Sequence, residues 1–170
     1  ALAFTKDKHI LQTIGQASLA SANVTGGEAG TTITNTGIAS ATDATAANAM
    51  IDALFGAAKQ LDANYVPSEG RKCFMRLEEY YKLANATNAI NVDFSGRGSI
   101  AEGKVVKIAG IELVPVAHFV SSNVNSGVDQ GSATAGGSNP QAVNLTNYVA
   151  LVSHPSAVGT VKLMDLGVEK

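Results

Sequence analysis

Apolar residues recur at steps of three and four in two stretches of the chain, and this spacing predicts two helices that each bury one face. The first is expected over 1–22 and the second over 43–61. Thr42 or Asp43 can cap the second helix, and the acidic Asp43 suits the positive end of its dipole. Small alanines in this helix allow close packing, most simply against a sheet. Its apolar stripe consists of Ala47, Ile51, Leu54, Ala58 and Leu61, widened by Met50 and Phe55.

Alternation of apolar and polar residues, the period of a strand, predicts the sheet of this protein. Residues 72–76 alternate in this way and predict a short strand. Residues 103–108 and 111–116 predict two more strands, joined as a hairpin at 109–110. A buried strand is expected over 148–152.

Shorter elements are expected between and after the strands. Proline and glycine indicate a turn over 64–71. A short helix is expected over 78–84, with acidic residues in its first turn. After Pro155 the pattern predicts a helical turn or two through residue 162, and then extended chain over 163–170.

Two stretches have no periodicity and consist mainly of Thr, Ser, Asn, Gly and Ala. Residues 23–40 predict a loop or a loose β-excursion. Residues 121–144 carry almost no large side chains and cannot bury enough apolar area to order themselves. The chain is therefore predicted to be one α+β domain, in which helices flank a small central sheet and two flexible insertions leave its surface.

Composition narrows the class of protein. With 170 residues, of which 45% are hydrophobic and 15% charged, the chain is large enough for one domain with a core. Its single cysteine excludes a disulfide within the chain. The net charge of −2 argues against a protein that binds nucleic acid mainly through phosphates. No apolar run approaches the roughly 20 residues of a membrane-spanning helix.

Both ends of the chain fall inside predicted elements. Residue 1 is not methionine and lies in the first predicted helix, and residue 170 lies in an alternating segment that has just begun. We therefore expect a fragment of a longer protein. A whole domain with short termini is the alternative.

Residues able to carry chemistry are few and lie far apart in the sequence. His9, His118 and His154 have no partner at the spacing of a metal site. His118 and His154 each follow a predicted strand, and a small site between them is one hypothesis. Cys73 lies within a strand, where a buried apolar thiol is a better interpretation than a nucleophile.

Other polar patterns have simpler explanations. The glycines over 96–101 imitate a dinucleotide-binding loop, but a hairpin follows them instead of a helix. Glu78 and Glu79 are adjacent on a helix and so do not share a face. The sequence therefore predicts no catalytic residue, no cofactor and no metal ligand. Basic residues that form either a weak patch or a solvated face are Arg71, Arg97, Lys104 and Lys107.

Three segments, in the same order, resemble parts of the major capsid proteins of tailed bacteriophages. The turn, strand and helix of that family are similar to VPSEGRKCFMRLEEYYKLA (66–84), and its hairpin is similar to GSIAEGKVVKIAGIELVPVAHF (98–119). The segment most similar to the short-tailed podovirus and autographivirus-like type is SHPSAVGTVKLMDLGVEK (153–170). The similarity extends from residue 43 onward, with 121–144 excluded.

This resemblance implies the shared fold of tailed-phage capsid proteins, with most of the chain in the axial domain. Residues 1–22 would be the end of the spine helix of the peripheral domain. Residues 23–153 would be the axial domain, with flexible insertions at 23–40 and 121–144. Residues 154–170 would form a return helix and begin a peripheral-domain strand. On this resemblance, the N-terminal arm, the extended loop and the remaining peripheral strands of the family are expected to lie outside this sequence.

The resemblance also implies a structural virion protein that is not an enzyme. Copies would associate through heterologous contacts into pentamers and hexamers of an icosahedral shell that encloses double-stranded DNA. The implied partners are further copies of the chain, a scaffolding protein and a portal, with loose contact to packaged DNA and none to a membrane. The implied location is the virion capsid, assembled in the host cytoplasm. Two other classes stay open: a secreted or surface binding module without catalysis, and a small hydrolase that uses His118 or His154.

Overall fold

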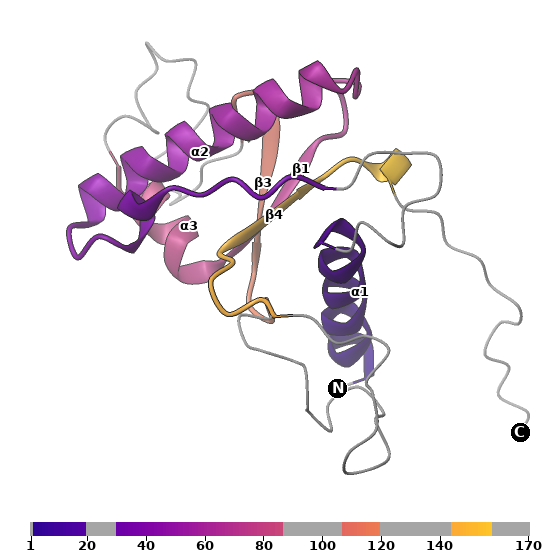
Figure 1. The fold of residues 1–170 in the computed structure, drawn as a ribbon. Coiled ribbons are helices and arrows are strands. Elements are labelled where there is room, and N and C mark those ends of the chain that lie inside the picture. Colours follow the sequence, from indigo (N-terminus) through magenta and orange to yellow (C-terminus); the bar gives the residue numbers. More distant parts are fainter. Residues whose placement is uncertain (1, 20–29, 87–106, 120–143, 158–170) are drawn as a thin grey trace, which may run out of the picture.

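The computed structural model of the protein describes residues 2–19, 30–86, 107–119 and 144–157. These residues form a four-stranded sheet with helices packed around it (Figure 1). Parallel and antiparallel strand pairs occur in the same sheet. The predicted α+β class is confirmed.

The sheet is built around β1 (Lys72–Arg76), in the strand order β2-β3-β1-β4. β1 pairs in parallel with β3 (Ile111–Val116) and antiparallel with β4 (Ala150–Ser153). The sequence predicts a buried strand over 148–152. A strand is observed there, but the prediction that it is buried is wrong. β4 lies at the edge of the sheet, so its residues are only half-buried.

The predicted hairpin joins β2 (Lys107–Ile108) to β3 in antiparallel pairing. Its two turn residues, Ala109 and Gly110, have φ values of 51° and 78°. Positive φ at both positions is the requirement of a two-residue type I′ turn, which Gly110 meets freely and Ala109 meets with strain. Residues 103–106 of the predicted strand lie outside the described residues.

Two helices cover one face of the sheet and build the core with it (Figure 1). They are α2 (Asp43–Ala63) and α3 (Leu77–Ala84), which pack against each other. Cys73 and Met75 point into this core, because they are buried and alternate with half-buried residues along β1. Core residues are Ala47, Met50, Leu54, Ala57, Ala58, Cys73, Met75, Tyr80, Leu83, Ala84, Ala86, Ile111 and Leu113.

The buried face of α2 is narrower than the sequence predicts. Met50 and Leu54 are buried, but Phe55, which the pattern assigns to the apolar stripe, is 57% exposed. Adjacent helical residues point about 100° apart, so Phe55 can face away from the covered side of α2 on which Leu54 lies. The assignment of Phe55 to the buried stripe is therefore wrong.

Residues 30–40 run along α2 and end in a 3-10 turn, η2 (Thr36–Ala39). The Asn35 side chain accepts a hydrogen bond from the Gly37 N–H and donates one to the Ala49 carbonyl of α2, both at 3.0 Å. Of the two structures expected here, a loop or a loose β-excursion, the loop is observed over 30–35, and the contacts of Asn35 and η2 hold it against α2. Residues 23–29 lie outside the described residues.

The helix α1 (Leu2–Leu19) lies on the other side of the sheet from α2. Its Ile10 and Ile14 face Phe74, whose side chain alternates with the core residues of β1. The predicted helix over 1–22 is thus observed over most of its length. After β4 the chain makes a 3-10 turn, η5 (Pro155–Ala157), and the rest of that predicted helical segment lies outside the described residues.

Candidate functional site

The histidines predicted as a joint site lie at opposite ends of the sheet. β3 runs parallel to β1 whereas β4 runs antiparallel to it, so the two strands end on opposite sides. His118 follows β3 and His154 follows β4, and the sheet therefore separates them. His9 lies on α1. The fold does not bring the three histidines together.

Cys73 is a buried side chain of the core. Its relative exposure is 0%, and desolvation by burial raises the pKa of the thiol to about 12. A thiol in this environment stays protonated at neutral pH and is a poor nucleophile. The interpretation of Cys73 as a small apolar core residue is confirmed.

Glu78 and Glu79 form ion pairs with basic neighbours. The exposed Glu78 accepts a hydrogen bond from Lys82 Nζ at 2.9 Å and lies 3.2 Å from Arg76 Nη2; the bond from Lys82, followed by the charges of Lys82 and Arg76, lowers the pKa of Glu78. The buried Glu79 lies with its Oε2 3.2 Å from Arg76 Nε, a charge contact without the alignment of a hydrogen bond. One carboxylate is buried and the other exposed, so they do not share a face.

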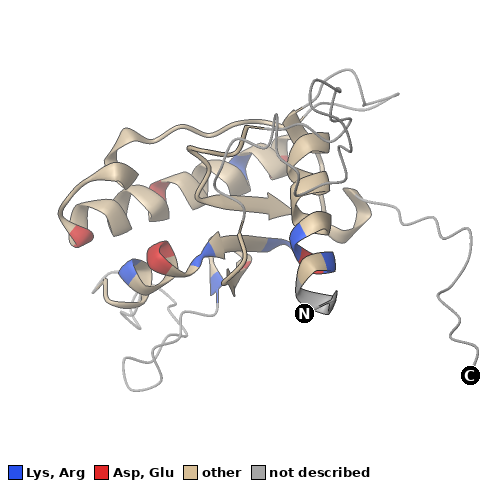
Figure 2. Ribbon diagram, turned by 90° about the horizontal axis from the view of Figure 1, so that it is seen from below, with Lys and Arg blue, Asp and Glu red and all other residues tan. Residues whose placement is uncertain are grey.

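Only two of the four basic residues considered from the sequence as a weak patch, Arg71 and Lys107, lie in the part of the chain that the structure describes. Arg71 is only 4% exposed, and Lys107 lies exposed on β2, while Arg97 and Lys104 lie outside the described residues. Figure 2 shows basic and acidic residues interspersed on α1, α2 and α3. The described ranges contain no cluster of His, Cys, Asp or Glu that could hold a metal ion. Within the same ranges, none of the helices has the length and hydropathy needed to cross a membrane.

A turn over 64–71, which we call the 64–71 turn, ends α2 with an unusual residue. Tyr65 N–H donates to the Asp62 carbonyl and Val66 N–H donates to the Leu61 carbonyl, both at 3.0 Å. These two bonds define a Schellman motif, in which Tyr65 occupies the left-handed position that glycine usually takes. Its φ is 56°, which costs a non-glycine residue roughly 1–2 kcal/mol. The Tyr65 side chain is 95% exposed.

The buried guanidinium of Arg71 holds the 64–71 turn in place. Its Nε donates to the Pro67 carbonyl at 2.9 Å, and its Nη2 donates to the Val66 carbonyl and to Asp62 Oδ1, the latter at 2.6 Å. Two carbonyls of the turn and a carboxylate of α2 are therefore fixed by one side chain. The sequence offered Arg71 only as a surface charge, because nothing in the spacing shows which carbonyls a long side chain will reach.

His154 ties the same turn to the end of β4. Ser156 N–H donates to His154 Nδ1 at 3.1 Å, so Nδ1 is unprotonated and Nε2 carries the proton. Nε2 then donates to the Glu69 carbonyl at 2.9 Å. Gly70, with a φ of 81°, lets the backbone turn beside this ring. His154 therefore has a structural role in fixing the 64–71 turn.

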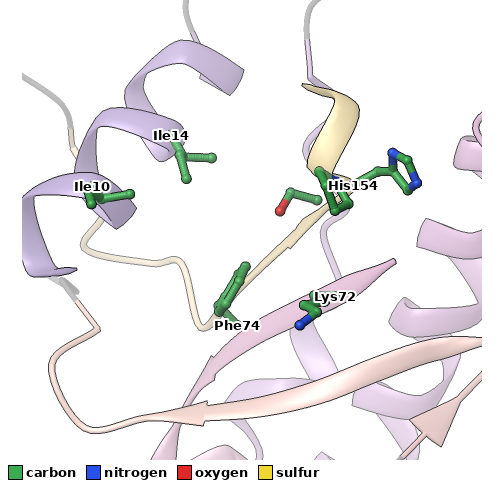
Figure 3. Close-up of a pocket in the computed structure, with 7 residues that line it drawn as sticks. Ile10, Ile14, Lys72, Phe74 and His154 are labelled. Carbon is green, nitrogen blue, oxygen red and sulfur yellow. The ribbon is translucent and has the colours of Figure 1, made fainter. Parts of the chain in front are cut away.

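A groove of about 270 Å³ lies between α1 and the sheet (Figure 3). Ile10 and Ile14 point from α1 toward Phe74, while the His154 ring turns away toward its own partners. The walls are mainly apolar, and of their polar members, Lys72, Ser153 and His154, the histidine is engaged with the Glu69 carbonyl, so the groove suits the packing of apolar groups. It is lined by Ile10, Ile14, Lys72, Phe74, Ser153, His154 and Pro155.

Comparison with known proteins finds one family that matches the whole chain. Residues 1–170 match the sequence model of a family described as Gp10A-like major capsid protein. The major capsid protein of Enterobacteria phage T3 is 31% identical over 128 residues, which are 72% of this chain and 37% of that protein. The major capsid protein of Escherichia phage T7 is 28% identical over 128 residues, which are 71% of this chain and 37% of that protein. The chain thus spans well under half of the length of these relatives.

Solved phage capsids have the same fold. A chain in the capsid structure of cyanophage P-SCSP1u superimposes with a TM-score of 0.69 at 34% identity, over 91% of this chain and 47% of that chain. A chain of the bacteriophage PhiM1 mature capsid superimposes with a TM-score of 0.66 over 90% of this chain and 46% of that chain, and its 21% identity supports a shared fold alone. The resemblance predicted from three segments of the sequence is confirmed, as is the predicted capsid protein fold.

Proposed function

Since the chain belongs to the Gp10A-like major capsid protein family, we propose that it forms part of a structural subunit of a bacteriophage shell and acts by associating with copies of itself. The match of all 170 residues to the family carries this proposal. The likeness to the cyanophage capsid chain supports it from the side of the fold. The role is structural and not catalytic, and the location is the virion capsid.

The proposed mechanism is association through geometry. Each copy uses two different surface patches, and a ring closes when the rotation between neighbours returns to the first copy. Copies of one chain form pentamers and hexamers, so a rigid body has to combine with segments that adapt. The core of α2, α3 and the sheet is the rigid body. Residues 23–40 and 121–144 remain the segments proposed from sequence to adapt, although 30–40 lie against α2.

The wider setting extends the same proposal. Residues 1–22 end a peripheral spine helix, 23–153 belong to an axial domain, and 154–170 return to the periphery. The shell encloses double-stranded DNA, and the net charge of −2 suits loose contact with it because few phosphates would be bound tightly. A scaffolding protein and a portal are the other proposed partners, with assembly in the host cytoplasm.

Sedimentation velocity of the expressed reading frame that encodes this chain tests the proposal. We expect discrete species of high mass, corresponding to capsomers or shells, in equilibrium with subunits over a range of protein concentrations. A single monomer boundary at every concentration would contradict the proposed function.

A further inference from the structure

The 64–71 turn carries an aromatic residue that the fold itself does not use. Tyr65 occupies the left-handed position of the Schellman motif, where glycine would be free of strain. Its side chain is 95% exposed and so gains almost nothing from burial in its own chain. An unfavourable backbone conformation held by its surroundings and combined with an exposed aromatic ring points to a role outside the folded monomer.

The turn that carries Tyr65 is fixed from two directions before any partner binds. Arg71 bonds to the carbonyls of Val66 and Pro67, and His154 bonds to the carbonyl of Glu69. Because these bonds restrict the backbone of the turn, little of its conformational entropy remains to be lost on association. A tyrosine on such a support offers a large contact area with few rotatable bonds.

We propose that Tyr65 is the anchor residue of a contact between copies of this chain, with its ring inserted into the surface of a neighbouring copy. This inference rests on the proposed function, since in a shell built of repeated subunits the surface that each copy meets most is another copy. Buried tyrosines are enriched among the few residues that dominate the binding energy of an interface. The exposed residues around Tyr65 on the same turn, Pro67, Ser68, Glu69 and Gly70, would form the rim of the contact.

Substitution of Tyr65 allows its effect on stability to be separated from its effect on self-association, because the two are expected to change in opposite directions. Tyr65→Gly removes the ring and relieves the backbone strain, so the melting temperature is expected to rise by a few degrees while self-association weakens on the order of tenfold or more. Tyr65→Asn, which also accepts the left-handed conformation, is expected to behave in the same way. Tyr81→Ala is the matched control, because Tyr81 is 61% exposed on the regular helix α3, and its self-association should equal that of the wild type.

Sedimentation velocity measures the self-association of these variants, and thermal melting measures their stability. Together they test whether Tyr65 anchors a contact between copies. Weaker association of Tyr65→Gly with an unchanged or higher melting temperature supports the inference. Association equal to the wild type in both Tyr65 variants would overturn it while leaving the proposed function intact. An equal loss in Tyr81→Ala would also overturn it, because a general loss of apolar surface would then explain the effect. A wild type that stays monomeric at all concentrations would contradict the proposed function and the inference together.

Discussion

The side of α2 on which a large apolar residue lies, more than its residue type, decides whether its side chain is buried. Leu54 is 4% exposed and packs in the core, and the next residue, Phe55, is 57% exposed. Burial of a leucine removes its whole side chain from water, whereas an outward-facing phenylalanine stays largely hydrated. The two neighbours therefore give a direct comparison of core and surface.

The substitution Leu54→Ala is expected to lower the free energy of unfolding by about 2–5 kcal/mol, because it leaves a cavity among packed side chains. Chemical denaturation measures the change. Phe55→Ala is the matched control and should change the free energy of unfolding by less than about 0.5 kcal/mol. Equal effects of the two substitutions would show that the buried face of α2 has been placed incorrectly.

Burial also controls the chemistry of Cys73. Because the pKa of the folded thiol is raised to about 12, an alkylating reagent at pH 8 should leave the native protein unmodified and label it after unfolding. The unfolded thiol titrates near 9.0, so its contribution to the free energy of unfolding is present below pH 9 and is lost as the pH rises toward 12. Mass spectrometry of the labelled protein provides the measurement. Rapid labelling of the native protein at pH 8 would contradict the burial of Cys73.

At the scale of elements, local periodicity was enough to predict the helices, the central strand and the hairpin. The spacing of Ala47, Ile51 and Leu54 predicts α2, and the alternation around Cys73 and Met75 predicts β1, because both patterns depend on near neighbours. The contacts that sequence could not predict join residues far apart in the chain. Asn35 bonds to Ala49 and His154 bonds to Glu69, and no local pattern records such pairs.

The same distinction, between local patterns and contacts of residues far apart in the chain, applies to the 64–71 turn and to the histidines. A turn over 64–71 was predicted from its proline and glycine. The fixed geometry of that turn was not predicted, because it depends on Arg71 reaching back to two carbonyls and on His154 arriving from β4. The hypothesis of a joint site of His118 and His154 is wrong because it also depends on long-range pairing. Only the pairing of β3 and β4 with β1 shows that these residues lie at opposite ends of the sheet.

The contact between η2 and α2 depends on two small residues that face each other. A Cβ added at Gly37 would lie 2.9 Å from the Ala49 Cβ, closer than two non-bonded carbon atoms normally approach. We expect Gly37→Ala to lower the free energy of unfolding by about 1–3 kcal/mol through this clash. The double substitution with Ala49→Gly should restore part of the loss, as measured by a double-mutant cycle.

A second glycine provides the control for this experiment. A Cβ added at Gly56, inside α2, would make ordinary contact with Ile33 at 3.7 Å. Gly56→Ala should therefore stabilise the protein by about 0.5–1 kcal/mol through its higher helix propensity. A destabilisation of the same size at both positions would contradict the close contact at Gly37.

At the scale of the whole molecule, the described residues combine a rigid core with exposed large side chains at its surface. Three aromatic side chains on different elements are each more than half exposed. They are Phe55 on α2, Tyr65 on the 64–71 turn and Tyr81 on α3. Charged residues of both signs are interspersed on the helices, so no single field dominates the described surface (Figure 2). Such a body suits association by shape, with charge contributing little to the choice of partner.

Electron microscopy of the assembled product of this reading frame tests the central claim most directly. The account predicts particles or capsomers in which copies of the chain surround five-fold and six-fold centres, each copy touching its neighbour through two different patches. Images that contain only isolated subunits, under conditions in which the protein is folded, would contradict it.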